Sequence, residues 1–309
     1  MARLSFPACF SAWPSHFSVF NVTLQTKATL VVLASPLVAL ALTLLAGPNG
    51  VVIAGVPLFA LCIGVAFFSQ WLAFIPAYIY QTEHYFDLSG SATYWLLALL
   101  GLLLGSQGDL RSMLLGILVM VWAARLGTFL FLRVRKKGSD SRFKDIIPDF
   151  RVHLLTWTLQ AMWISITASC ALLAMTSLNK IPFDSWALAG LVLWLLGFSI
   201  EVIADRQKQV FRSPPENANR FITTGLWAFS RHPNYLGEIM LWTGIATIAF
   251  PVLIGWQLVS LLSPLFVVFL LTRVSGIDMQ ERQNDRSWGN DPAYLQYKAS
   301  TPVLFPLPR

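Results

Sequence analysis

Long apolar segments recur along the whole 309-residue chain and alternate with short polar segments. A helix that crosses a bilayer needs about 20 mainly apolar residues. The second apolar segment is long and contains Gln70 and Pro76, which predict a tilt or a kink. The pattern predicts an all-α membrane protein, a multi-pass helical bundle of about eight transmembrane helices. The predicted spans cover residues 28–46, 51–78, 92–105, 112–132, 154–176, 185–204, 237–256 and 258–274.

Composition indicates that lipid is the solvent of this chain. Hydrophobic residues make up 56% of it and charged residues only 12%, with a mean hydropathy of +0.62, whereas soluble domains carry roughly 25% charged residues. No internal repeat or separate soluble domain is visible, so residues 1–309 are predicted to form a single integral membrane domain that starts with two helices at 28–78. The first 26 residues do not have the pattern of a cleavable signal peptide.

The formal net charge of +7 first suggests a nucleic-acid partner, but the basic residues lie between apolar segments. They gather in the loops at 133–151 and 205–236 and in the tail after residue 274, which eight spans place on one side of the membrane. Arg111 and Lys180 lie on the other side. Because cytoplasmic loops are rich in Lys and Arg, both termini are predicted to be cytosolic and nucleic acid is not an expected partner. The membrane is a bacterial inner membrane or that of the endoplasmic reticulum or another organelle.

Metal chemistry finds no support in the sequence. The chain has three cysteines and four histidines, and neither set has a metal-ligand spacing. A Gly-x-Gly-x-x-Gly motif after a strand is absent, which excludes a Rossmann fold. No metal partner is therefore predicted.

The densest polar segment runs from Glu201 to Glu238. Glu201 and Asp205 share one helix face, where two like charges are costly unless a cation or a ligand lies between them. The arginines that follow suit phosphate, which guanidinium groups bind in a bidentate fork. Pro233 predicts a helix start, whose free N–H groups attract anions. A basic loop that touches anionic membrane lipids would explain the arginines, but it would not explain Glu238 in the first turn of a membrane helix.

Two further places offer polar groups within or beside apolar segments. Arg125 lies inside the fourth predicted span, where it is either functional or directed toward the cytosol. The segment at 81–87, which contains Tyr85 and Asp87, precedes the third span, and Tyr94 lies inside that span. Any of these side chains could donate a proton, although an ordinary interfacial loop is the alternative.

Several of these strings together resemble a known family. The residues from Asp205 to Arg212, the Gly225-Leu226-Trp227 triplet and the run from Ser230 to Glu238 are similar to the steroid 5α-reductase C-terminal family, and most similar to its DUF1295 branch. The resemblance covers about residues 80–306. Further residues that fit this branch are Asp140, Arg142, Phe143, Ser275, Gly276, Ile277, Tyr294, Tyr297 and Pro302.

The resemblance implies an NADPH-dependent reductase of a carbon–carbon double bond conjugated to a carbonyl, acting on a lipid-like substrate such as a steroid or an isoprenoid. Animal steroid reductases carry a tyrosine in the helix that matches the fourth span, but this chain has Trp122 and Arg125 there. The expected catalytic residues are therefore Asp87, Tyr85, Tyr94 and Arg125. The expected NADPH-binding residues are Glu201, Asp205, Arg212, Arg220, Arg231, His232, Asn234, Tyr235, Glu238 and Arg273.

Two other functions stay open. Isoprenylcysteine carboxyl methyltransferases carry a similar Arg-His-Pro motif, a Glu-Arg pair and a Tyr-x-x-Tyr tail, which here match the Glu281-Arg282 pair and the Tyr294 and Tyr297 spacing. Their ligand, S-adenosylmethionine, has no phosphate and does not need Arg212 and Arg220. The second alternative hypothesis is a non-enzymatic subunit that packs lipid or pigment in a larger membrane complex.

Overall fold

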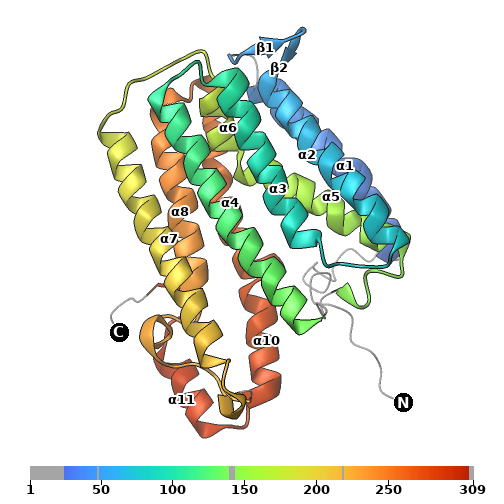
Figure 1. Cartoon of the computed structure of the whole chain (residues 1–309), viewed down its shortest axis with the longest axis vertical. Helices are drawn as coiled ribbons and strands as arrows, with labels where there is room; N and C mark the ends of the chain where they lie inside the picture. The colour runs from blue at the N-terminus through green and yellow to red at the C-terminus, as the bar shows by residue number, and fades with distance from the viewer. Residues whose placement is uncertain (1–23, 47–48, 139–142, 218, 306–309) are drawn as a thin grey trace, which may run out of the picture. The chain divides into compact units, whose positions relative to one another are not determined.

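A computed structural model describes residues 24–46, 49–138, 143–217 and 219–305, which are largely helical (Figure 1). Their contacts divide the chain into two units. The first unit consists of the chain up to residue 187 together with residues 248–263, and the second of residues 188–247 and the chain from residue 264 onward. Asp140, Arg142 and most of the first 26 residues lie outside the described residues. The single membrane domain stays a prediction.

The first unit contains α1 to α6. Both α1 and α2 pack against α5, and α3 packs along α4. A pair of two-residue strands, β1 (Val52–Ile53) and β2 (Val56–Pro57), forms an antiparallel hairpin just before α2. The helices are α1 (Leu24–Ala46), α2 (Leu58–Ile79), α3 (Phe86–Leu100) with its π-helical continuation η1 (Gly101–Gly105), α4 (Leu110–Lys137), α5 (Phe150–Thr167) and α6 (Ser169–Thr176). The 3-10 segments η5 (Phe250–Val252) and η6 (Gly255–Leu262) complete this set.

Arg111 is fully buried in the first unit at the start of α4, with a side chain only 1% exposed. Its guanidinium donates to the carbonyl oxygens of Ile248 at 2.6 Å, Pro182 at 2.8 Å and Ile181 at 3.3 Å, and it pairs with Asp184 at 2.7 Å. A buried charge is tolerated when it is paired and hydrogen-bonded. Arg111 therefore holds segments of the first unit together.

Lys180 is bound in a similar way within the same unit. Its ammonium group donates to the carbonyl oxygens of Met175 at 2.9 Å and Gly105 at 3.1 Å and to the hydroxyl of Ser112 at 3.3 Å. These carbonyls lie in the last turns of η1 and α6, where backbone oxygens lack intrahelical partners. The two cations that the charge pattern leaves opposite the basic loops thus both have structural partners.

The second unit contains most of α7 (Ser185–Phe211) and α8 (Pro233–Ala249), which cross at paired glycines. A Cβ atom on Gly237 would lie 2.5 Å from the carbonyl oxygen of Gly197, and one on Gly244 would lie 2.6 Å from that of Gly190. Each pair is seven residues from the other along both helices, so one face of each helix carries the contact. Small residues at such a crossing let membrane helices approach closely.

The remaining elements of the second unit lie between the two crossing helices and after them in the chain. The connection between α7 and α8 contains the 3-10 turns η3 (Pro215–Asn217) and η4 (Gly225–Ala228). The chain after residue 263 forms α9 (Ser263–Phe269), the π-helical segment η7 (Leu270–Val274), α10 (Ile277–Trp288) and α11 (Pro292–Ser300).

The predicted multi-pass helical fold is confirmed. Seven helical segments among the described residues are long and apolar enough to cross a membrane, and the count rises to eight when α5 and α6, bent by 54° at their junction, are taken as one span. The chain is therefore an integral membrane protein.

Several predicted span boundaries are wrong, including the following four. The second span begins at Leu58, because the residues before it turn through the positive φ angles of Ala54 and Gly55 into the hairpin. The third begins at Phe86 and reaches full length. The seventh begins at Pro233, so Glu238 lies in the second helical turn rather than the first. The last apolar segment continues past residue 274 into α10.

Candidate functional site

A shallow recess in the second unit has a cavity volume of only about 30 Å³ and is otherwise open to solvent. Four cationic side chains line it, and they come from the end of α7, the loop after it and the residue pair before α8. They are Lys208, Arg212, Arg220 and Arg231. Arg212 and Arg220 are exposed, whereas Arg231 is half-buried. Guanidinium groups in such a cluster suit phosphate oxygens.

Aromatic rings form another part of the recess. Trp227 is 3% exposed, and its ring lies 4.6 Å from the ammonium of Lys208, a distance typical of a cation–π contact. Phe221 packs its ring against those of Trp288, Tyr294 and Tyr297 at centroid distances of 5.7, 5.3 and 5.8 Å. Flat apolar surfaces of this kind can stack on an aromatic base.

The tyrosine hydroxyls of this aromatic group are donors. Burial, followed by the hydrogen bond to Asp285, raises the pKa of Tyr294, and burial raises the pKa of Tyr297 to about 12. Both phenols therefore keep their protons at neutral pH. Tyr294 donates to Asp285 at 2.9 Å and Tyr297 to the carbonyl oxygen of Trp227 at 2.7 Å.

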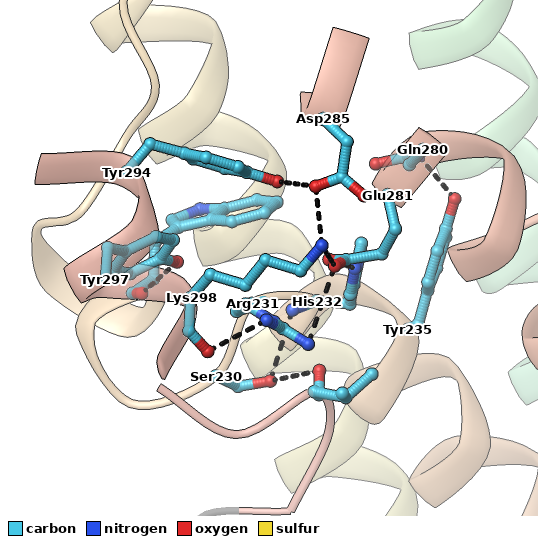
Figure 2. A network of polar contacts seen from close by, with 12 residues as sticks. Ser230, Arg231, His232, Tyr235, Gln280, Glu281, Asp285, Tyr294, Tyr297 and Lys298 are labelled. Atoms are coloured by element: carbon cyan, nitrogen blue, oxygen red, sulfur yellow. Dashed lines mark hydrogen bonds and ion pairs between the residues drawn. The ribbon is translucent and has the colours of Figure 1, made fainter. Parts of the chain in front are cut away.

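The third part of the recess is one face of α10. Gln280, Glu281, Asn284 and Trp288 line it, at spacings that place them on neighbouring turns of the helix. Figure 2 shows that Glu281 lies at the centre of a polar network joining this helix to the Ser230-Arg231-His232 segment before α8. The recess thus combines basic, aromatic and hydrogen-bonding surfaces.

Three cationic or basic side chains surround the carboxylate of Glu281. His232 Nε2 lies 2.9 Å from Glu281 Oε1, and Arg231 Nη2 and Lys298 Nζ each lie 3.5 Å from Oε2. Lys298 also donates to Asp285 at 2.5 Å, one turn further along α10. The network in Figure 2 therefore joins α10, α11 and the residues before α8 in one unit.

The end of the described chain fastens the same segment from the other side. The backbone N–H of Arg231 donates to the carbonyl oxygen of Pro302 at 3.0 Å, and the hydroxyl of Ser230 donates to that of Val303 at 3.2 Å. Arg231 Nη1 donates to the carbonyl oxygen of Lys298 at 3.0 Å. The Arg-His-Pro segment is thus held by contacts far along the chain.

His232 is the most buried member of this network, at 1% exposed. Its ring stacks on that of Tyr235 at 5.5 Å, and the hydroxyl of Tyr235 accepts a hydrogen bond from Gln280 at 2.5 Å. Burial lowers the pKa of His232 below its ordinary value; the contact with Glu281 opposes this effect, and the charges of Lys208 and Arg231 add to it. His232 is consequently neutral at pH 7.

The structure brings some of the expected cofactor residues together and leaves others apart. Arg212, Arg220 and Arg231 line the recess, and His232 and Tyr235 belong to the network behind it. The other five expected cofactor residues are not among the described residues that line the recess. Glu201 and Asp205 are buried in α7, Asn234 and Glu238 are half-buried in α8, and Arg273 is exposed in η7.

Sequence reasoning missed several lining residues. Lys208 lies in the predicted basic loop, and Glu281 belongs to the pattern shared with the methyltransferases. Gln280 and Asn284 belong to none of the motifs described above. A signal was present, because 280, 281, 284 and 288 fall on one face of a polar helix, but the predicted last span ended before that helix.

The expected catalytic residues all lie in the first unit. Tyr94 is buried in α3, its ring edge faces Trp122 at 5.1 Å, and its hydroxyl is hydrogen-bonded to that of Thr167. Asp87 is in the first turn of α3, where a carboxylate is favoured by the helix dipole. Tyr85 is exposed just before that helix.

Arg125 lies inside α4 and is half-buried. Its guanidinium carbon is 5.3 Å from the centre of the Phe129 ring, which is a cation–π contact along the helix. This contact fits either of the two interpretations of an arginine within an apolar segment, so the catalytic role of Arg125 stays a prediction.

The fold and the recess define a multi-pass helical membrane protein with a basic and aromatic site on one unit. The chain belongs to the family described as "Protein of unknown function (DUF1295)", whose model matches residues 73–301. The similarity to steroid 5α-reductases inferred from the motifs is confirmed by curated relatives.

Three curated relatives illustrate this similarity. An uncharacterized protein of Schizosaccharomyces pombe is 26% identical over 231 residues, which are 63% of this chain and 63% of the relative. The 3-oxo-5-alpha-steroid 4-dehydrogenase 1 of Rattus norvegicus is 33% identical over 119 residues, 38% of this chain and 40% of the relative. The Mus musculus protein of the same name is 31% identical over 84 residues, 27% and 31%.

The chain therefore spans less than two-thirds of the length of each of these relatives. No solved structure gives a significant match. The comparisons establish a membrane family with steroid reductases among its distant relatives.

Proposed function

We propose that this protein is a membrane-embedded, NADPH-dependent reductase of a carbon–carbon double bond conjugated to a carbonyl, in a lipid-like substrate with a steroid, isoprenoid or related skeleton. The observation that carries the proposal is the convergence of Lys208, Arg212, Arg220 and Arg231 on one recess with aromatic walls. The names of the rat and mouse relatives agree with this reaction class.

The residues of the recess fit a phosphorylated dinucleotide. Four cationic side chains against a single carboxylate, Glu281, leave the described lining strongly positive, as a ligand with several phosphate charges requires. Trp288 and Tyr297, which are partly exposed, offer surfaces for an aromatic base. S-adenosylmethionine has no phosphate and would offer Arg212 and Arg220 no phosphate oxygens to bind.

The contribution of NADPH, when bound, is a hydride for the β-carbon of the conjugated double bond. The protein's own task is to orient the reactants, exclude water and stabilise the negative charge that develops on the substrate oxygen. A buried hydrogen-bond donor within an apolar span suits the last task, because its hydrogen bond is strong in a medium of low dielectric constant.

Tyr94 is the strongest of the four candidates for that donor. The hydroxyl proton of Thr167 goes to the carbonyl oxygen of Trp163 at 2.9 Å, so Thr167 is left to accept from Tyr94. The phenolic O–H of Tyr94 therefore acts as a hydrogen-bond donor inside the first unit, which is the role the proposal requires. Tyr85 is exposed and Asp87 occupies a helix start, which makes both weaker candidates.

The test is ligand-induced thermal stabilisation of the purified protein in detergent or nanodiscs. NADPH should raise the melting temperature more than NADH does, and S-adenosylmethionine should have no effect. Arg212→Ala should weaken NADPH binding about 10- to 100-fold, since a hydrogen bond to a charged group contributes about 1.5–3 kcal/mol. Arg286→Ala, which removes an exposed arginine of α10 that does not line the recess, should leave the affinity within about twofold.

Each alternative has its own result in this experiment. Equal stabilisation by NADPH and NADH would contradict recognition of the 2′-phosphate. Stabilisation by S-adenosylmethionine alone would support the methyltransferase. Binding of neither, with an effect of Arg212→Ala only on assembly, would support a non-enzymatic subunit. Oxidation of NADPH in the presence of a panel of steroid and isoprenoid enones then tests the substrate class.

A further inference from the structure

Glu281 is the one carboxylate among the described residues that line the recess. A negative charge beside a phosphate weakens phosphate binding, so its place among Lys208, Arg212, Arg220 and Arg231 needs an explanation. The side chain is 16% exposed; it is ion-paired to Arg231 and Lys298, and it accepts a hydrogen bond from the neutral ring of His232. These contacts neutralise the charge of the carboxylate, which indicates that Glu281 has a role other than binding a cationic ligand.

The guanidinium of Arg231 is fixed from two sides. Nη1 donates to the carbonyl oxygen of Lys298 at 3.0 Å, and Nη2 faces Glu281 Oε2 at 3.5 Å. Its Nε is buried and has no hydrogen-bond partner among the described residues. Because a guanidinium has five N–H donors in a rigid plane, anchoring two of them sets the direction of the others.

Glu281 also fixes the ring that follows Arg231 in the chain. The carboxylate accepts from His232 Nε2, which places the proton of the neutral ring on that nitrogen. His232 in turn stacks on Tyr235, the third residue of the motif to be ordered in this way. One carboxylate on α10 therefore orients two consecutive side chains at the start of α8.

We propose that Glu281 is the positioning residue of the recess: it holds the guanidinium of Arg231 and the adjacent ring of His232 in place, so that the remaining N–H groups of Arg231 meet a phosphate of the bound ligand. This inference rests on the proposed function, because the phosphate is that of NADPH. It assigns Glu281 an indirect role, in which the carboxylate binds the protein's own cations and the cations bind the ligand.

Charge and position make opposite predictions for Glu281→Gln. If only net charge mattered, removing a carboxylate from a basic recess would tighten the binding of every anion. If Glu281 positions Arg231, the same variant should bind NADPH about tenfold more weakly, because a charged hydrogen bond would be lost or misdirected. Competition by inorganic phosphate should be unchanged or stronger in the variant, since a small ion does not require a fixed geometry.

A second variant separates these effects again. Glu281→Asp keeps the charge and withdraws the carboxylate by one methylene. The positioning role therefore predicts weaker NADPH binding, whereas an effect of charge alone predicts unchanged NADPH binding. Asp278→Asn is the matched control: it removes one negative charge from the same helix at a residue that does not line the recess. It should bind NADPH as the unmodified protein does.

The outcomes distinguish failure of this inference from failure of the proposed function. If the unmodified protein binds no NADPH, the proposed function is wrong. If it binds NADPH and both Glu281 variants bind it as tightly or more tightly, the inference is wrong while the function stands. The melting temperature without ligand identifies a variant that fails to fold. If Glu281→Gln does not fold, the NADPH affinity of Glu281→Asp decides.

Discussion

His232 and Glu281 meet across 49 residues of sequence, with the ring Nε2 2.9 Å from the carboxylate Oε1. His232 immediately precedes α8, and Glu281 belongs to α10, so the contact joins two elements of the second unit. The ring is almost fully buried, while the carboxylate is shared with Arg231 and Lys298. Burial and hydrogen bonding thus act on His232 in opposite directions.

This balance predicts a pH dependence of stability. The pKa of His232 is lowered in the folded protein, mainly by burial, from an unfolded value of about 6.5. The unfolded chain therefore binds a proton before the folded one as pH falls. Above about pH 6.5 the contribution of His232 to stability is complete, and it is lost progressively as pH falls from there through the folded pKa.

The measurement is the melting temperature of the purified protein between pH 8 and about pH 5, above the range in which ordinary carboxylates titrate. His232→Gln keeps a side chain that can donate to Glu281 but cannot be protonated. Its melting temperature should be lower throughout, and its decline toward pH 5 should be shallower than that of the unmodified protein. Parallel declines would show that His232 is not the titrating group.

The sequence predicts the membrane fold well because lipid imposes a simple rule. A span needs enough consecutive apolar residues, and that property is local, as in the segment that became α2. The same rule also explains the failures. Val52 and Ile53 are as apolar as helix residues, so the pattern placed the short hairpin inside the second span, and nothing local predicts the bend between α5 and α6.

The recess is less accessible to sequence reasoning. Arg212 and Arg220 are found because arginine clusters beside a helix start are unusual and have a clear chemistry. Glu281 is not found, because its role depends on contacts with Arg231 and His232 some 50 residues away along the chain. Local patterns contain no information on such pairs. The polar face of α10 is the one signal in the sequence. It indicates that this face contacts polar groups, but it does not identify the residues that it contacts.

The α7–α8 crossing predicts a strong effect of one methyl group. In Gly237→Ala the new Cβ would overlap backbone atoms of Gly197 and Glu201, at 2.5–2.6 Å. Overpacking of this kind costs about 1–3 kcal/mol, so the melting temperature should fall. Gly64→Ala in α2 is the matched control, because its Cβ meets nothing within 4 Å. It should be neutral or stabilise by up to about 1 kcal/mol. Equal effects of the two substitutions would contradict the close crossing.

The basic loops predict which residues face the cytosol. In a cysteine-free background, single cysteines at Lys136 and Glu216 should react with an impermeant thiol reagent from the cytosolic side. A cysteine at Leu178, which is 62% exposed, should react only from the opposite side. Arg111 and Lys180, which are predicted to lie on that side, are bound to carbonyl oxygens. Their structural contacts explain why two cations are found on the side that is otherwise poor in Lys and Arg. Labelling of positions 136 and 216 from different sides would contradict the topology.

Tyr94 gives a test of catalysis that is separate from cofactor binding. Tyr94→Phe removes one phenolic proton and leaves the ring against Trp122. If this phenol stabilises the developing charge on the substrate oxygen, the turnover rate should fall about 100-fold or more, while NADPH affinity stays the same. Loss of the bond to Thr167 should reduce stability by only about 1 kcal/mol. Tyr80→Phe, at an exposed position outside the four candidates, is the control and should retain full activity. A turnover rate unchanged by Tyr94→Phe would remove Tyr94 from the mechanism and direct attention to Asp87 and Arg125.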